Sequence, residues 1–109
     1  MDTHEVRILS SEYFERIETA IGRLPTDGIE ACLEEAGLRI MFEDGKEILL
    51  DRNDEFQRIT LRCFEGPTHS YYNETEEDWY AVGRETVLLA DISAALSSSI
   101  GADFSLEIA

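Results

Sequence analysis

The first part of the chain carries apolar residues at the spacing of an α-helix. Over residues 10–24, the apolar side chains at intervals of three and four are Tyr13, Ile17, Ala20, Ile21 and Leu24. Such positions collect on one face of a helix, so the stretch predicts an amphipathic helix. Ser10 or Ser11 is predicted to cap its N-terminus. Pro25 and the following Asp27-Gly28 pair are predicted to end it.

From residue 29 the apolar pattern changes to a period of two, which is typical of strands with one buried face. Asp44-Gly45 gives the strongest hairpin signal, because this pair tolerates the positive φ angles of a tight turn. Gly66-Pro67 is expected to turn the chain. The predicted strands cover residues 29–34, 38–42, 46–51, 57–64, 69–73 and 78–82.

A second helix is predicted from Glu85 or Thr86 to Gly101, a natural C-terminal stop. Its buried stripe comprises Leu88, Ile92, Ala95, Leu96, Ser99 and Ile100. Residues 104–108 alternate again and are expected to lie extended against the core. The sequence therefore predicts an α+β two-layer sandwich, with N- and C-terminal helices packed on one face of an antiparallel five- to six-stranded sheet. Residues 1–109 form one domain in this prediction.

Acidic residues dominate the composition and exclude two classes of partner. The 24 Asp and Glu residues outnumber the 9 Lys and Arg residues, which gives a net charge of −15. Nucleic-acid binding needs clustered basic residues, so this class is excluded. No apolar run approaches the roughly 18–20 residues that span a bilayer, and an anionic membrane surface would repel the chain. The N-terminal residues lack the features of a signal peptide, so a cytoplasmic protein is expected.

Residues suited to covalent or zinc chemistry are sparse. Cys32 and Cys63 make neither a disulfide framework nor a metal motif, and both are expected to be small buried side chains in a reducing compartment. His4 is expected in a frayed terminus and His69 beside a turn. Neither histidine has a nucleophile at a recognisable spacing, so an enzyme is not expected.

Carboxylates are the most informative residues of the sequence. Three are spaced three residues apart on the first helix and are expected to line up on the face away from the core. Three more follow the helix and run along the first strand. If that strand lies at the sheet edge, the two sets merge into one surface, which we call the acidic ridge. Its members are Glu12, Glu15, Glu18, Asp27, Glu30 and Glu34.

Three interpretations of the acidic ridge are open. Oxygen ligands suit hard cations such as Ca²⁺, Mg²⁺, Mn²⁺ or iron, and exposed carboxylates on separate elements would hold them weakly and with low specificity. Alternatively, the carboxylates only solvate the surface, or they steer a basic protein partner.

Aromatic residues gather in the last two predicted strands. With one face of the sheet covered by helices, some of these rings pack inward, and any ring that points outward marks an interface. The residues are Tyr71, Tyr72, Trp79 and Tyr80.

The stretch from Gly37 to Glu55 resembles the signature of the frataxin family, bacterial CyaY branch. It shows an alternating strand, a tight Asp-Gly turn and an apolar strand that ends in Asp-Arg-Asn. Asp78-Trp79-Tyr80, with Gly83 and the Leu pair after it, resembles the family's Trp-containing strand, glycine turn and Leu-rich final helix. Ser11-Glu12-Tyr13 resembles the opening of helix one. The resemblance covers roughly residues 11–107.

This resemblance implies a function. Frataxins are non-enzymatic proteins of iron–sulfur cluster assembly that bind Fe²⁺ or Fe³⁺ weakly on an acidic ridge. That ridge also contacts the cysteine desulfurase, and the open sheet face contacts the assembly scaffold protein. The resemblance places iron on the acidic ridge of this chain and implies a monomer in the absence of iron. The implied partner-binding residues are Trp79, Asp51, Asn53 and Arg58.

The chain also departs from the family pattern. Its first helix is expected to be one to two turns shorter than usual. Asp51 and Asn53 replace an Asn and a Gln of the family, and Arg58 replaces a Gln. Thr60 stands where the central strand of the family has a Trp. The open sheet face is therefore altered, as in a diverged member.

The sequence is also compatible with two other functions. An acidic inhibitor or immunity-type protein would block a basic enzyme through aromatic contacts and would need no metal. A weak ferroxidase-like activity on bound Fe²⁺ is the remaining enzymatic reading, although the sequence offers no Glu-x-x-His di-iron pattern.

Overall fold

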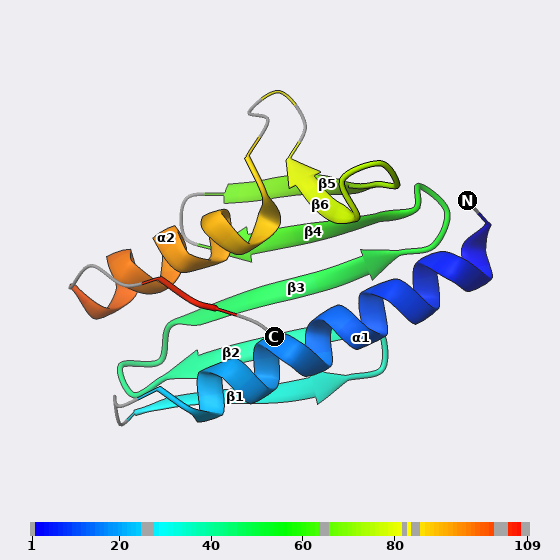
Figure 1. Ribbon diagram of the computed structural model, residues 1–109. Coiled ribbons are helices and arrows are strands. Elements are labelled where there is room, and N and C mark those ends of the chain that lie inside the picture. Colours follow the sequence, from blue (N-terminus) through cyan, green and yellow to red (C-terminus); the bar gives the residue numbers. More distant parts are fainter. Residues whose placement is uncertain are drawn as a thin grey trace.

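A computed structural model describes residues 2–24, 28–63, 66–81, 83, 86–101 and 105–107. Six consecutive strands lie between two helices (Figure 1). The elements are α1 (Thr3–Gly22), β1 (Ile29–Glu34), β2 (Gly37–Phe42), β3 (Glu47–Asn53), β4 (Arg58–Cys63), β5 (Gly66–Asn73), β6 (Asp78–Ala81) and α2 (Leu88–Ile100).

The strands form one antiparallel sheet in the order β1-β2-β3-β4-β5-β6. Both helices lie on the same face of this sheet, α1 along β1 and β2 and α2 on the side of the later strands (Figure 1). The other face is open. The predicted α+β two-layer sandwich is confirmed.

Alternation along each strand sends apolar residues to the helix-covered face. Leu38 and Ile40 of β2 pair with Leu50 and Ile48 of β3, and all four are 0 % exposed. Helix residues close the core from the other side: Val6, Phe14, Ile17, Leu88, Ile92 and Leu96 are all buried. The core therefore lies entirely between the sheet and the two helices.

Helix α1 begins seven residues earlier than the sequence pattern predicts. Asp2 caps it, since its Oδ1 accepts a hydrogen bond of 2.8 Å from the backbone N–H of Glu5. Val6 is 1 % exposed and Ser10 is 0 % exposed, so the first two turns belong to the core. The predicted start at residue 10, the serine cap and the frayed His4 are therefore wrong. Pro25 and Asp27 lie outside the described residues.

The hairpin at Asp44-Gly45 is confirmed. Gly45 has a φ of 92°, which favours glycine, and its N–H donates to the Phe42 carbonyl at 3.0 Å. Gly66-Pro67, expected as a turn, instead begins β5. β6 pairs only with residues 70–73, so the start of β5 has no strand on the β6 side. Proline, which lacks a backbone N–H, is tolerated at such an edge position.

The end of the chain follows the predicted pattern. Gly101, with a φ of 80°, ends α2. Leu106 is 3 % exposed, and its N–H donates to the Ser93 hydroxyl at 2.9 Å, which ties the last described segment to α2. Phe104 lies outside the described residues.

The two cysteines differ from the expectation of burial. Cys32 is exposed, because it alternates with Ala31 and Leu33 and so lies on the open face of β1. Cys63 is half-buried and packs against the core. Both thiols are free. None of the helices in the described ranges is both long and apolar enough to cross a membrane.

Candidate functional site

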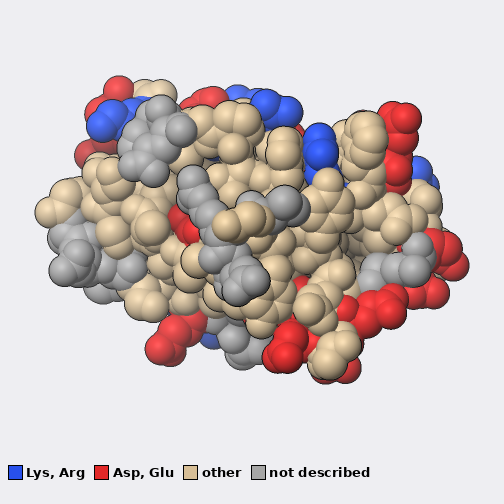
Figure 2. Space-filling view, turned by 90° about the horizontal axis from the view of Figure 1, so that it is seen from above, with Lys and Arg blue, Asp and Glu red and all other residues tan. Residues whose placement is uncertain are grey.

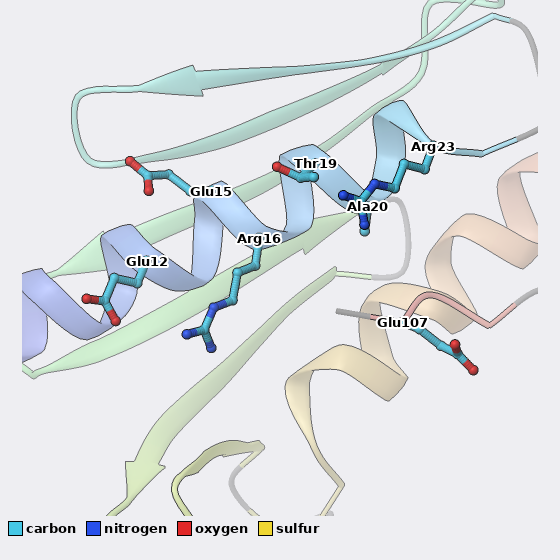
Figure 3. A pocket seen from close by; sticks show the side chains of 7 residues that line it. All are labelled: Glu12, Glu15, Arg16, Thr19, Ala20, Arg23 and Glu107. Atoms are coloured by element: carbon cyan, nitrogen blue, oxygen red, sulfur yellow. The ribbon is translucent and has the colours of Figure 1, made fainter. Parts of the chain in front are cut away.

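The three helix carboxylates of the acidic ridge do not form a single line. A helix turns about 100° per residue, so a spacing of three shifts each side chain about 60° backward. Figure 3 shows Glu12 and Glu15 leaving α1 in different directions. Both are exposed, whereas Glu18 is half-buried. The three carboxylates therefore do not align on the face away from the core, contrary to the expectation from the sequence. They are spread over about a third of the helix circumference.

The strand carboxylates of the ridge belong to the sheet edge. β1 pairs only with β2, so it is an edge strand as expected. Glu30 and Glu34 are exposed and alternate with Ala31 and Leu33, which face α1. Their side chains therefore leave the strand on the open face, and the helix set and the strand set approach each other around the edge of the sheet.

The two sets come closest at the end of β1. A hollow of about 130 Å³ is lined by Glu15 of α1 and by Glu34 and Glu35 of the β1–β2 turn region. Arg52 lines the same hollow and supplies a positive charge. Glu35 was not singled out from the sequence, although its place directly after Glu34 is the signal that would have found it. Glu30 borders a different hollow, beside Glu43 near the end of α1.

Basic residues already engage part of this edge. Arg39 of β2 donates to Glu34 at 3.3 Å and to Glu47 at 3.1 Å. The hydrogen bond to Glu47 is the main reason that the pKa of Arg39 is raised, followed by the charge of Glu34. The charge of Glu34 is therefore partly neutralised by Arg39. Glu15, Glu18 and Glu30 carry no ion pair within the described residues.

Within the described part of the chain, no three His, Cys, Asp or Glu side chains converge as they would around a metal ion. Asp27 lies outside that part. A groove of about 300 Å³ on the other side of α1 is lined by Glu12 and Glu15 together with Arg16, Arg23 and Glu107 (Figure 3). The acidic ridge is thus an open surface with arginines on one flank.

The open sheet face carries three of the four residues expected to bind a partner. Asp51 and Asn53 leave β3 beside their cross-strand neighbours Thr60 and Arg58. Asp51 accepts from Arg62 Nε at 2.9 Å. Arg58 donates to the Tyr71 hydroxyl at 3.2 Å, and its guanidinium lies 4.8 Å from the centre of the Phe56 ring.

Trp79 does not belong to that surface. It pairs with Tyr72 across β5 and β6 on the helix-covered face and is only 2 % exposed. Its ring lies 5.3 Å from the ring of Tyr72 and 6.4 Å from that of Tyr13, measured between centroids. A partner on the open face therefore cannot reach its ring, and a contact of Trp79 with a partner stays a prediction that the open face does not support.

Other rings do point outward. Tyr71 and Tyr80 pair with each other on the open face, and Tyr71 is 38 % exposed. Beside them, Thr60 is 4 % exposed and its Oγ1 lies 2.9 Å from His69 Nδ1. The open face thus combines exposed aromatic rings with a hydrogen-bonded pair of Thr60 and His69. The sequence did not reveal this pair.

Charge is unevenly distributed over the surface. In the view of Figure 2 most basic side chains gather along the upper margin, whereas acidic side chains dominate the lower margin. The open face contributes Arg39, Arg58 and Arg62 to the basic set. A protein with a net charge of −15 therefore presents mixed charge on its sheet and mainly negative charge elsewhere.

Comparison with known proteins identifies the fold. No protein-family model matches the sequence, and no curated protein matches it either. Among solved structures, frataxin from Psychromonas ingrahamii, studied for stability modulation within the CyaY protein family, superposes with a TM-score of 0.86. The match covers 96 % of this chain and 97 % of that one at 19 % sequence identity. The chain has the frataxin fold, and the resemblance found in the sequence is confirmed at that level.

Proposed function

We propose that the protein is a divergent member of the frataxin family, CyaY branch, and acts as an iron-binding accessory protein of iron–sulfur cluster assembly. The observation that carries this proposal is the likeness to a frataxin over nearly the whole of both chains. The motif from Gly37 to Glu55, which forms β2, the Asp-Gly turn and β3, supports it independently. In this role the protein works in the cytoplasm and has no enzymatic reaction of its own.

Iron would bind on the acidic ridge. Glu12, Glu15 and Glu18 on α1 and Glu30 on β1 make no ion pair with a described residue. Glu34 and Asp27 complete the set. Carboxylate oxygens are suitable ligands for Fe²⁺ and Fe³⁺, and an open arrangement on separate elements favours weak, reversible binding. Such binding suits an ion that is to be passed on.

The partners in this proposal are a cysteine desulfurase and a scaffold protein. The acidic ridge would meet a basic patch of the desulfurase, where charge complementarity mainly raises the association rate. The scaffold would meet the open face at Asp51, Asn53 and Arg58, with Tyr71 as an exposed aromatic contact. Trp79 takes no part, because it is buried.

An anaerobic titration of the ¹⁵N-labelled protein with Fe²⁺ tests the proposal. Paramagnetic broadening confined to residues near 12–18 and 30–34 is the expected result, with the monomer retained before iron is added. Ca²⁺ serves as the control for unspecific carboxylate binding. Broadening spread over the whole acidic surface, or an identical pattern of shifts with Ca²⁺, would reduce the ridge to a solvated face.

A second candidate function is an acidic inhibitor of a basic enzyme, with no metal. The observation that favours it is the exposed aromatic pair Phe56 and Tyr71, which are 53 % and 38 % exposed near Arg58. Aromatic and arginine side chains are enriched at binding hot spots. Tight association with a basic enzyme that persists in a metal chelator would favour this function over the first.

A further inference from the structure

The two edges of the sheet differ. At β6 the chain covers its own edge, since the Ala81 N–H donates to the Thr86 carbonyl at 2.8 Å and Tyr80 forms an isolated bridge with Val87. β1 is the outermost strand at the other edge (Figure 1). Among the described residues, no strand or bridge pairs with its outer side. β1 is therefore the open edge of the sheet.

The hydrogen bonds of Phe42 show how the backbone of β1 is turned. The Phe42 N–H donates to the Lys46 carbonyl, and the Phe42 carbonyl accepts from the Gly45 N–H, both at 3.0 Å. Both groups point away from β1, so Phe42 and its cross-strand partner Ile29 form a non-hydrogen-bonded pair. The N–H and carbonyl of Ile29 consequently point away from β2.

This orientation repeats at every second residue of β1. Hydrogen-bonded and non-hydrogen-bonded pairs alternate along an antiparallel ladder, so the backbone groups of Ala31 and Leu33 also point outward. Within the described residues, the one contact to these outward groups is that of the Cys32 thiol with the Leu33 carbonyl, at 3.7 Å. A row of free N–H and C=O groups on an edge strand is a ready template for pairing with another chain.

The side chains beside this row alternate in character. Glu30 and Glu34 are exposed on the open face of the sheet. On the helix-covered face, Leu33 is 41 % exposed and borders a hollow together with Phe14 of α1. A strand laid against β1 therefore meets carboxylates on one face and apolar surface on the other.

A second copy of the chain does not fit this edge. Antiparallel pairing of two β1 strands about Cys32 places Glu30 of each copy directly opposite Glu34 of the other, and such like-charge pairs are destabilising. A shift by two residues leaves carboxylates as diagonal neighbours. Each chain also carries a net charge of −15, so two copies repel each other. The occupant that complements this edge is positively charged.

We infer that the outer edge of β1 binds an extended, basic segment of a protein partner as an additional antiparallel strand. Lys or Arg residues of that segment lie opposite Glu30 and Glu34, and apolar residues lie opposite Ala31 and Leu33. Main-chain hydrogen bonds supply the affinity, and the alternating side chains supply the specificity. Antiparallel addition continues the pattern of the sheet and is the slightly more stable form of pairing. The inference needs no iron and does not depend on the proposed function.

Cys32 allows the added strand to be trapped. In the antiparallel alignment, the partner residue opposite Cys32 belongs to a non-hydrogen-bonded pair with Cα atoms about 4.5 Å apart, which suits a disulfide. The probe is the pentapeptide acetyl-Lys-Val-Cys-Val-Lys-amide, supplied as its disulfide-linked dimer. Exchange with the Cys32 thiolate forms the protein–peptide disulfide and releases one peptide thiolate. Peptide mapping distinguishes this product from reaction at Cys63.

Two methylated peptides test the strand pairing. In the inferred alignment the N–H groups of both valines point at β1, whereas those of both lysines point away. N-methylation of the valines should lower the equilibrium constant for exchange at Cys32 at least about tenfold, because two hydrogen bonds are lost. N-methylation of the lysines should leave the constant nearly unchanged, although charge and thiol are the same. Equal constants for the two peptides, or the reverse order, would overturn the inference.

Amide hydrogen exchange gives a second readout, which does not depend on affinity. In the adduct of the unmethylated peptide, the amides of Ala31 and Leu33 should exchange more slowly, because they become hydrogen-bonded to the peptide. The Cys32 amide already faces β2 and should change little. Unchanged exchange at Ala31 and Leu33 would show that the tethered peptide does not pair with β1 and would overturn the inference.

Paired variants test the role of charge. The double variant Glu30→Gln with Glu34→Gln removes both facing charges, and the exchange constant for the unmethylated peptide should fall about fivefold, since two cross-strand ion pairs are lost. Glu55→Gln with Glu76→Gln removes the same charge from exposed turns away from β1 and should change little. Equal losses in both variants would mean that only the overall charge attracts the peptide, against the inference. Thermal unfolding of each variant confirms that the fold is kept.

Discussion

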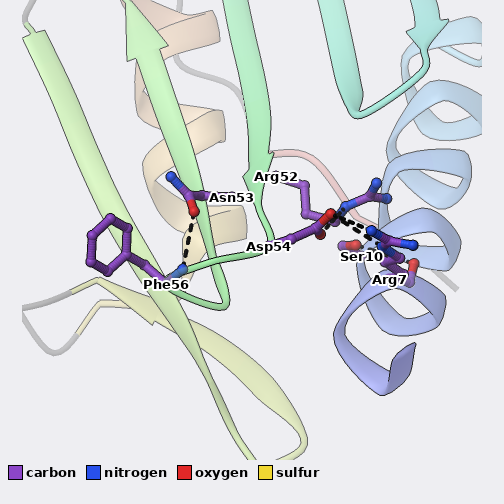
Figure 4. A network of polar contacts seen from close by, with 6 residues as sticks. All are labelled: Arg7, Ser10, Arg52, Asn53, Asp54 and Phe56. Atoms are coloured by element: carbon purple, nitrogen blue, oxygen red, sulfur yellow. Dashed lines mark hydrogen bonds and ion pairs between the residues drawn. The ribbon is translucent and has the colours of Figure 1, made fainter. Parts of the chain in front are cut away.

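Arg7 on α1 and Asp54 after β3 form an ion pair across 47 residues of sequence, with 2.9 Å between Arg7 Nη2 and Asp54 Oδ2. Arg52 completes the contact, since its Nε donates to the other carboxylate oxygen at 2.8 Å (Figure 4). Asp54 therefore joins the first turns of the helix to the end of the third strand. The early start of α1 is what brings Arg7 within reach.

Asp54→Asn tests this link. The variant keeps the shape of the side chain but removes its charge, and we expect the free energy of unfolding at pH 7 to fall by about 1 kcal/mol, the upper end for a partly exposed ion pair. Glu55→Gln in the same turn is the control. A loss no larger than that of the control would show that the contact does not stabilise the fold.

The same pair predicts a dependence on pH. The hydrogen bond from Arg7 is the largest cause that lowers the pKa of Asp54. A lowered pKa in the folded state means that the stabilisation is complete above the unfolded pKa of about 3.9 and is lost as the pH falls through the lower folded value. The difference in stability between wild type and Asp54→Asn should therefore shrink below about pH 4, as followed by urea unfolding at a series of pH values. A difference that grows on acidification contradicts this assignment.

Charge reversal separates the iron site from the fold. Replacement of Glu15, Glu18 and Glu30 by Lys changes the net charge by +6, from −15 to −9. Localised broadening by Fe²⁺ should disappear, whereas the melting temperature should stay the same or rise, because repulsion among like charges is reduced. Unfolding of this variant at ordinary temperature would mean that the ridge residues are structural.

Gly37 is predicted to be irreplaceable for a steric reason. A Cβ at this position would overlap the Leu50 carbonyl oxygen of the neighbouring strand. Gly37→Ala should therefore lower the free energy of unfolding by about 2 kcal/mol or more, because backbone atoms must move. Gly22→Ala is the matched control: no atom lies within 4 Å of its Cβ, and stability should be unchanged or rise by up to about 1 kcal/mol. Equal effects in denaturant unfolding would contradict the clash.

The two thiols should differ in reactivity. Cys32 is exposed on the edge strand, whereas Cys63 is half-buried with its Sγ 3.8 Å from the Gly66 carbonyl oxygen. Labelling of the folded protein with a thiol reagent should show one fast and one slow phase, since access limits the second reaction. Cys32→Ser should remove the fast phase. Its persistence in that variant would place the accessible thiol at Cys63.

Most of the fold could be predicted from the sequence because its strands have clear local signals. The alternation of apolar residues and the Asp44-Gly45 turn define β2 and β3 within a residue or two. The predicted start of α1 is too late, although Val6 and Leu9 keep the helical spacing up to Tyr13. A polar residue, Ser10, occupies a buried position there, and Asp2, whose side chain accepts from the Glu5 N–H, is the cap.

The candidate site was less predictable because it depends on orientation. Four residues of β6 show alternation but do not reveal which set faces the helices. Pairing with Tyr72 decides this, and it places Trp79 in the core. Similarly, a spacing of three residues suggests a line of carboxylates on α1, but the rotation of the helix separates Glu12 from Glu18. The composition predicts the large negative net charge of the chain. Only the structure shows which carboxylates are neutralised by a basic residue, as Glu47 is by Arg39.

The order of strands in the sheet is also the order of strands along the chain. Every pairing in the sheet therefore closes a short loop, so the entropic cost of forming the sheet is low and contact order is modest. We expect refolding in about milliseconds to tens of milliseconds, as for mixed α/β domains with mainly local contacts. During synthesis the hairpins could form one after another behind α1, and α2 with Leu106 would close the core last.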